Sequence, residues 1–180
     1  MPRLEGKTAL ITGATGGIGE ATAKRYLEEG ANVVLAGRSE AKLKDTRDRL
    51  SAYSAMTQSV GDAADEADVQ RAVSTAVETF GGLDILVANA GTEGVVTPLT
   101  QQTVEDFNQV INTNVTGVWL AMKHSAPVMQ NRGGGSIIAF FRRLVAKFGF
   151  PQIAPYMLAS TRFMVWSRLP VLSLPKEAFE

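Results

Sequence analysis

The stretch Thr8–Gly19, with the sequence TALITGATGGIG, decides the fold. A short apolar run ends at Thr12, a glycine-rich turn follows, and the next residues favour a helix. A strand, a glycine turn and a helix in this order present unpaired backbone N–H groups at a helix N-terminus, where the dipole favours an anion. Gly13 permits the tight turn, whereas Gly17 and Gly19 let a pyrophosphate and the neighbouring strand approach without a Cβ in the way. The stretch predicts a phosphate-binding βα unit; the alternative is a βα turn without a ligand.

The composition is that of an ordinary globular protein. The 180 residues are 45% hydrophobic and 20% charged with a formal net charge of zero, so we expect one domain and neither nucleic acid nor a membrane surface as partner. The chain has no cysteine and a single histidine, His124, which argues against disulfides and against a metal site. No apolar run approaches a membrane span and the first residues lack a signal-peptide core, so we expect a cytoplasmic protein.

Strand-like and helix-like segments alternate along the chain. Further apolar runs predict strands at 32–37, 56–60, 83–88 and 136–141. Helices are predicted at 20–27, at 40–50, from about 65 to 80 and, as one long helix, from 103 to about 129. This alternation predicts an α/β fold with a parallel sheet, right-handed crossovers and helices on both faces.

The polar ends of the predicted strands indicate where a ligand binds. In a doubly wound sheet the ligand lies beyond the carboxyl ends of the strands. The segments 13–19, 37–39, 62–63 and 89–91 all follow strands and are rich in glycine or polar residues. Four such exits on one edge form an extended crevice, which suits a dinucleotide better than a mononucleotide.

Several motifs together resemble the short-chain dehydrogenase/reductase family. Residues 12–19 match its cofactor motif TGxxxGIG, residues 88–91 (ANAG) are close to its NNAG, and residues 112–117 (NTNVTG) resemble the segment that carries its catalytic-site Asn. The resemblance is continuous over about residues 5–138. It implies a Rossmann-like doubly wound sheet of strand order 3-2-1-4-5, and hydride transfer between a nicotinamide cofactor and a small-molecule alcohol or carbonyl substrate.

The resemblance assigns roles to individual residues. The cofactor-binding positions that it implies are Gly13, Thr15, Gly17, Ile18, Gly19, Arg38, Ser39, Asp62, Ala63, Asn89, Ala90 and Gly91. Asp62 resembles the residue whose side chain contacts the adenine. Asn114 takes the place of the catalytic-site Asn, at an expected helix kink with a bound water, and Tyr156 takes the place of the acid/base phenol. The alternatives are an exposed helical Asn and a packed aromatic.

The end of the second predicted strand bears on the choice of cofactor. NAD-preferring members of the family carry an acidic residue there, which accepts hydrogen bonds from the ribose hydroxyls. Here the corner is Gly37-Arg38, and a guanidinium can pair with a 2′-phosphate. We therefore expect NADP(H), with NAD(H) as second choice; the alternative is that Arg38 is a solvated surface charge.

The chain departs from the family pattern after the fifth predicted strand. The family has a Ser-Ser pair there, whose Ser holds the substrate carbonyl, and a Lys four residues after the Tyr, which lowers the pKa of the phenol. This sequence has Phe141-Arg142-Arg143 and Ser160 at those places. We expect a dinucleotide-binding domain over residues 1–156, an irregular tail over 157–180, and a truncated chain with impaired catalysis.

Shifted reading frames, near 139–146 and after 156, would explain both departures. If the last base of each codon is read with the first two of the next, residues 141–143 can give Ser-Ser and residues 157–160 can give Ala-Ser-Lys. Two alternatives stay open: a non-catalytic NADP(H)-binding protein and an inactive truncated fragment.

The long helix is the expected contact between subunits. Members of the family usually form homo-oligomers through this helix, which starts near Thr103, and through the helix after Tyr156. Within it, Phe107 and Trp119 are expected as core residues or helix contacts, and His124 is expected on the helix surface.

Overall fold

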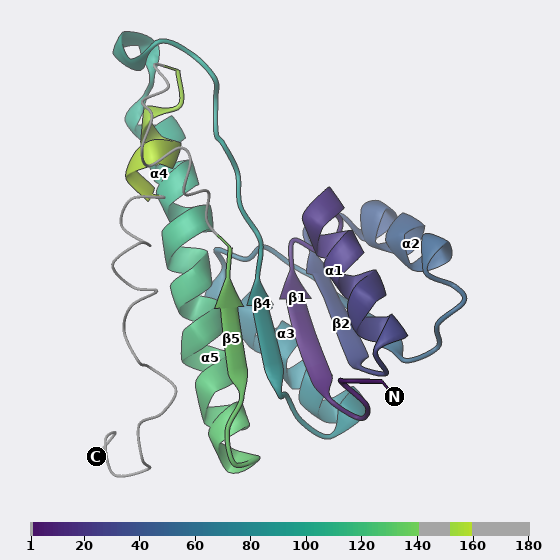
Figure 1. Cartoon of the computed structure of the whole chain (residues 1–180). Coiled ribbons are helices and arrows are strands. Elements are labelled where there is room, and N and C mark those ends of the chain that lie inside the picture. Colours follow the sequence, from purple (N-terminus) through teal and green to yellow (C-terminus); the bar gives the residue numbers. More distant parts are fainter. Residues whose placement is uncertain (1, 141–151, 160–180) are drawn as a thin grey trace.

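The computed structural model describes residues 2–140 and 152–159. Over these residues the chain forms a five-stranded parallel sheet of order β3-β2-β1-β4-β5 (Figure 1). The strands are β1 (Thr8–Thr12), β2 (Asn32–Gly37), β3 (Met56–Val60), β4 (Ile85–Ala88) and β5 (Ser136–Ala139). The predicted doubly wound fold and its strand order are confirmed.

Helices cover both faces of the sheet. They are α1 (Gly17–Glu28), α2 (Glu40–Arg49), α3 (Glu66–Phe80), α4 (Val104–Ile111) and α5 (Gly117–Asn131), with a short 3₁₀ turn η1 (Leu99–Gln101). α1 and α2 pack on one face of the sheet, and α3 and α5 pack on the other (Figure 1). The crossovers therefore place the carboxyl ends of all five strands on one open edge.

The central strands are buried on both faces, which explains their continuous apolar sequences. Alternate side chains point to opposite faces of a strand. In β1, Ala9 and Ile11 pack with α1 and α2, whereas Leu10 packs with α3 and α5. In β2, Val34 lies in the same core as Leu10, and Leu35 lies in the opposite one. The two cores pack against opposite faces of the sheet. The carboxyl edge of the sheet stays uncovered, so residues from several strands can form one site there.

The long predicted helix is interrupted. Residues Asn112–Thr116 form a π-helical segment, η2, between α4 and α5. The π-helical segment changes the phase of the helical repeat between α4 and α5. Phe107 and Trp119, expected as core residues or helix contacts, are 37% and 45% exposed, so neither is a fully buried core residue.

Polar contacts fix α5 against its neighbour α3. His124 Nε2 lies 2.8 Å from Glu66 Oε1, and Lys123 Nζ donates to the same oxygen at 2.7 Å. Lys123 also lies 5.1 Å from the centroid of the Trp119 ring. His124 is therefore a paired residue between two helices, with a side chain that is only 17% exposed.

Most of the predicted tail, and the positions where the family has its Ser-Ser pair and its Lys, fall outside the described residues. β5 ends at Ala139, and positions 141–151 and 160–180, which include Arg142, Arg143 and Ser160, lie outside the described part of the chain. Residues 154–159, with Tyr156, are helical.

Candidate cofactor site

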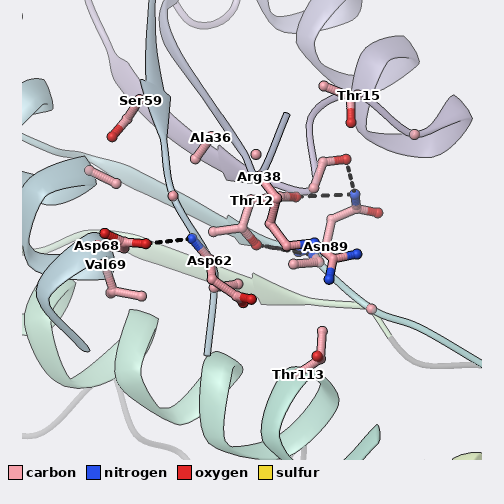
Figure 2. Close-up of a pocket in the computed structure, with 18 of the residues that line it drawn as sticks. Thr12, Thr15, Ala36, Arg38, Ser59, Asp62, Asp68, Val69, Asn89 and Thr113 are labelled. Carbon is pink, nitrogen blue, oxygen red and sulfur yellow. Dashed lines mark hydrogen bonds between the residues drawn. The ribbon is translucent and has the colours of Figure 1, made fainter. Parts of the chain in front are cut away.

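A cavity of about 360 Å³ lies along the carboxyl edge of the sheet. Its walls come from the turn after β1, from the ends of β2, β3 and β4, and from the first turns of α3 (Figure 2). The predicted residues that line it are Gly13, Thr15, Gly17, Ile18, Arg38, Asp62, Ala63, Asn89, Ala90 and Gly91. The structure thus brings together residues that lie far apart in the sequence.

The glycine turn is shaped by close backbone approaches. Gly13 has a φ of +63°, and a Cβ built on it would lie 2.8 Å from Ala90 Cα. A Cβ on Gly19 would collide with the carbonyl oxygen of Gly13. Gly19 is buried and serves this packing without lining the cavity.

Gly17 differs from these two glycines because it opens the helix towards the cavity. α1 begins at Gly17, and among the described residues no atom would lie within 4 Å of a Cβ built there. The first N–H groups of a helix have no partner within the helix. The turn therefore offers N–H groups, the positive end of a helix dipole and free space for an anion.

Reciprocal hydrogen bonds fix the end of β4 to the end of β1. Thr12 Oγ1 accepts from the backbone N–H groups of Asn89 and Ala90, each at 3.1 Å. The Asn89 side chain returns the contact, with Nδ2 donating to Thr12 O at 3.1 Å and to Gly13 O at 3.0 Å (Figure 2). Asn89 therefore acts on the site by holding the glycine turn in place.

The end of β2 supplies the positive charge. Arg38 is the basic side chain among the described residues that line the cavity. Ser39, next to it, does not line the cavity, because its Oγ caps α2 by accepting from Lys42 N at 3.3 Å. A serine directly before a helix is a typical cap, so the sequence alone indicates this role.

The end of β3 and the first turn of α3 supply negative charge, and the residue on α3, Asp68, is one that the sequence did not reveal. Asp62 N donates to Asp68 Oδ2 at 2.7 Å, and Asp62 Oδ1 accepts from Ala64 N at 2.9 Å. The N–H of Asp62 and the guanidinium of Arg71 outweigh burial and hold the pKa of Asp68 below its ordinary value. Asp68 also lines the cavity. The sequence feature that could have identified Asp68 as a site residue is its position in the first turn of a predicted helix, shortly after the end of a predicted strand.

Other lining residues were not among the positions assigned from the sequence. Gly16 and Gly37 lie in the predicted strand exits 13–19 and 37–39, and the others are Leu10, Thr12, Ala36, Ser59, Gly61, Val69, Ala72 and Thr113. Most of them are small or apolar and follow the same sequence pattern as core residues, so the sequence alone does not indicate that they line a cavity.

Asn114 lies in η2 and turns towards the loop that follows β4. Its Oδ1 accepts from Thr92 N and its Nδ2 donates to Thr92 O, both at 2.8 Å. A Cβ on Gly91 would lie 3.4 Å from Asn114 Oδ1. Asn114 is not one of the residues lining the cavity, although its neighbour Thr113 is.

Tyr156 lies in a helical segment beside the loop after β4. The segment is attached at Gln152, whose carbonyl oxygen accepts from Thr97 N at 3.3 Å and from Gln102 Nε2 at 3.0 Å. Tyr156 is half-buried and does not line the cavity. The structure thus places its segment next to η1 and the start of α4 (Figure 1).

Neither a metal centre nor a membrane-spanning helix is present in the described part of the chain. No group of His, Asp or Glu side chains within 2–140 and 152–159 is arranged to hold a metal ion. In the same part of the chain no helix is both long and apolar enough to cross a bilayer.

Comparisons with known proteins bear on the whole arrangement. The sequence profile of the family described as short chain dehydrogenase matches residues 7–161. The chain is 47% identical to glucose 1-dehydrogenase of Gluconobacter oxydans (strain 621H) over 120 residues, which are 66% of this chain and 45% of that protein. It is 42% identical to the mitochondrial borneol dehydrogenase of Lavandula x intermedia over 141 residues, 77% of this chain and 52% of that protein.

A solved structure agrees with the sequence comparisons. The crystal structure of a short-chain type dehydrogenase/reductase from Mycobacterium marinum superimposes with a TM-score of 0.85 at 30% identity, over 91% of this chain and 67% of that one. The chain spans about half the length of the two curated relatives named above. The glycine turn, the strand order and the matched residues 7–161 lead to one conclusion: the chain belongs to the short-chain dehydrogenase family.

Proposed function

We propose that the cavity at the carboxyl edge of the sheet binds NADP(H), and that the chain belongs to an oxidoreductase that transfers hydride between this cofactor and a small alcohol or carbonyl compound. The observation that carries the proposal is the continuous cavity from the N-terminus of α1 to Arg38 and Asp62. Family membership implies a nicotinamide cofactor, and the named relatives are dehydrogenases.

The walls of the cavity fit the parts of a dinucleotide. The N-terminus of α1 would hold the pyrophosphate, because Gly17 leaves space there and the dipole attracts negative charge. Arg38 and Asp62 would hold the adenosine. The segment Asn89–Gly91 and Thr113 would line the space for the nicotinamide. This division assigns Gly13, Thr15, Ile18, Ala63 and Ala90 to the walls. We propose residues 1–156 as the cofactor-binding domain.

The proposed choice of NADP(H) over NAD(H) rests on charge. Arg38 lines the cavity at the end of β2, directly after Gly37. A guanidinium in this place pairs with a 2′-phosphate through charge-assisted hydrogen bonds, whereas binding the ribose hydroxyls of NAD would favour an acidic residue there.

The remaining chemistry is a proton transfer at Tyr156. The cofactor, when bound, supplies or accepts the hydride. Tyr156 then gives a proton to the substrate oxygen or takes one from it, and Asn114 holds the adjoining loop through Thr92. A phenol transfers a proton efficiently near neutral pH only if its pKa is lowered from about 10. Ser160 stands where the family has the Lys that lowers it, so we propose that catalysis by this chain is impaired.

The presence of Ser160 in place of the family's Lys also favours a second candidate function, a protein that binds NADP(H) without turning over a substrate. The two candidates share the cofactor site and differ only at Tyr156 and its partners. An inactive fragment is the third possibility, and it predicts no cofactor binding.

We also propose that the chain pairs with a second copy through the outer face of α4 and α5. Three large apolar side chains of these helices, Val104, Phe107 and Trp119, are exposed, at 67%, 37% and 45%. Exposed apolar surface of this kind is typical of an interface. Sedimentation of the purified chain tests this proposal separately.

Cofactor titration tests the proposed function. We expect NADPH to raise the unfolding midpoint in proportion to the logarithm of its concentration, because a ligand that binds only the folded state stabilises it by mass action. NADH should require a higher concentration for the same shift. Assays with a panel of ketones and aldehydes then separate the two candidates: turnover supports an oxidoreductase, and binding without turnover supports a cofactor-binding protein. A midpoint that neither nucleotide moves would contradict both.

A further inference from the structure

The segment that follows β3 is held at two points by one pair of side chains from α3. Asp68 Oδ2 accepts the Asp62 N–H at 2.7 Å. Arg71 pairs with the other oxygen of Asp68 and donates from Nη2 to Val60 O at 2.9 Å. The residues on both sides of Gly61 are therefore attached to the first turns of the same helix.

The packing around Gly61 shows how closely this contact is fitted. A Cβ built on Gly61 would lie 2.7 Å from Asp68 Cβ and 2.8 Å from its Cγ. The absence of a side chain at position 61 lets the carboxylate of Asp68 reach the backbone of Asp62. Asp62 itself forms a local turn, with Oδ1 accepting from Ala64 N at 2.9 Å.

Asp68 is not needed to start the helix in which it lies. The N-cap of α3 is Asp65, whose Oδ1 accepts from the Asp68 N–H at 2.9 Å. The cap fixes the backbone of Asp68, and its own carboxylate reaches back across the cavity wall to Asp62 (Figure 2). A carboxylate that accepts from a backbone N–H and pairs with a guanidinium forms charge-assisted bonds, which are stronger than neutral ones.

We propose that Asp68 is a positioning residue for the adenine end of the cofactor site, which holds the backbone of Asp62 so that the Asp62 side chain selects adenine. This inference rests on the proposed function, and it adds that discrimination between purine bases depends on a carboxylate on α3. The Arg71–Asp68 pair acts on the base through Asp62.

The test compares two ligands that differ only in the base. NADPH carries adenine, with an exocyclic amino group that donates to a carboxylate, whereas its analogue with an unsubstituted purine base carries a hydrogen atom in place of that amino group and cannot form this bond. The measured quantity is the ratio of the two dissociation constants, obtained by calorimetry on the full chain. For the unmodified chain we expect NADPH to bind at least about tenfold more tightly, as for a hydrogen bond to a charged group.

Substitutions at Asp68 should act on this ratio. For Asp68→Ala we expect the ratio to fall to within about twofold of unity, because Asp62 loses its anchor. Asp68→Asn keeps an acceptor for the Asp62 N–H, so its ratio should stay closer to that of the unmodified chain. Glu66→Ala is the matched control: it removes another carboxylate from the first turn of α3, one whose partners are Lys123 and His124 on α5, and it should leave the ratio unchanged.

Each outcome decides the inference. If Asp68 had only a structural role, its loss would weaken the binding of both ligands equally. An unchanged ratio in Asp68→Ala would therefore overturn the inference, and so would a ratio of unity in the unmodified chain. If Asp68→Ala does not fold, Arg71→Gln replaces it, and the inference requires a smaller fall of the ratio in the same direction. Failure of the unmodified chain to bind either ligand would contradict the proposed function instead.

Discussion

Asn114 and Thr92 are paired in both directions: the amide of Asn114 accepts from the Thr92 N–H and donates to the Thr92 carbonyl, each at 2.8 Å. The two residues belong to different layers, since Thr92 follows β4 and Asn114 lies in η2. The pair fixes the loop after β4 to the long helical region at the π-helical segment. The first role of Asn114 is therefore to hold the end of the cavity at Gly91, whatever part it takes in catalysis.

Replacing Asn114 by Ala should lower stability through this pair. The two backbone groups of Thr92 would lose their partners, and we expect a loss of about 2 kcal/mol, or roughly 4–8 °C in the unfolding midpoint. Asn108→Ala, at an exposed site on α4, is the control and should change stability by less than about 0.5 kcal/mol. Equal effects of the two variants would show that the Thr92 pair contributes nothing.

The glycines of the turn should separate folding from binding. We expect Gly19→Ala to destabilise the free protein, by about 2 kcal/mol or more, because the new Cβ meets the Gly13 carbonyl. Gly17→Ala should leave the midpoint of the free protein nearly unchanged, since its Cβ enters open space, but should weaken NADPH binding because that space is proposed for the pyrophosphate. Thermal unfolding with and without NADPH distinguishes the two effects. Tight NADPH binding by Gly17→Ala would argue against this position for the pyrophosphate.

Reversing the charge at Arg38 should reverse the cofactor preference. For Arg38→Asp we expect the affinity for NADPH to fall by about 10–100-fold, as for a lost hydrogen bond to a charged group, while the affinity for NADH stays or rises. Arg47→Asp, the same charge change on the exposed side of α2, controls for the general field. Equal losses in both variants would mean that Arg38 does not contact a 2′-phosphate.

The architecture could be predicted because two features of the sequence, the apolar runs and the positions of the glycines, indicate the same fold. Strands buried on both faces have continuous apolar runs, and the glycines at 13 and 19 are dictated by backbone approaches that a side chain would block. The interruption at Asn112–Thr116 could not be predicted, because a π-helical segment leaves the composition of a helix unchanged.

The candidate site was predictable where it consists of backbone turns and less so where a helix contributes to it. Asp62 and Arg38 follow strands, so their position on the carboxyl edge follows from the topology. Asp68 reaches the cavity only because Gly61 lets α3 lie close to the end of β3, and that proximity is a tertiary feature. The roles of the predicted residues in cofactor binding and catalysis stay predictions.

Asp84, at the opposite edge of the sheet, should make stability depend on pH. Burial raises the pKa of its carboxyl, but the Thr8 N–H at 2.9 Å and the cations of Arg132 and Lys7 outweigh burial, so the pKa lies below its ordinary value. A carboxyl whose pKa is lowered by folding contributes stability that is fully present above its unfolded pKa, about 3.9, and is lost as the pH falls through the folded value.

For Asp84→Asn we therefore expect a loss of about 2 kcal/mol at pH 7, and a smaller difference from the unmodified chain as the pH falls below about 4. Denaturant unfolding at several pH values measures this convergence. Asp48→Asn, at an exposed site on α2, should differ little from the unmodified chain throughout. A difference for Asp84→Asn that stays constant with pH would mean that the charge of Asp84 does not contribute.

The gene should show whether the departure from the family pattern is a property of the protein. The codons for residues 141–143 can encode Ser-Ser in a shifted frame, and those for residues 157–160 can encode Ala-Ser-Lys. Upstream, residues 12–117 keep the family's motifs in order. We expect the nucleotide sequence over codons 138–180, determined from independent clones, to contain these residues in the shifted frames, with an open continuation. The parent protein would then be an ordinary reductase with a complete set of Ser, Tyr and Lys. If the shifted frames instead lack these residues or contain stop codons, Arg142, Arg143 and Ser160 are genuine, the phenol of Tyr156 lacks the family's Lys, and cofactor binding without turnover becomes the expected function.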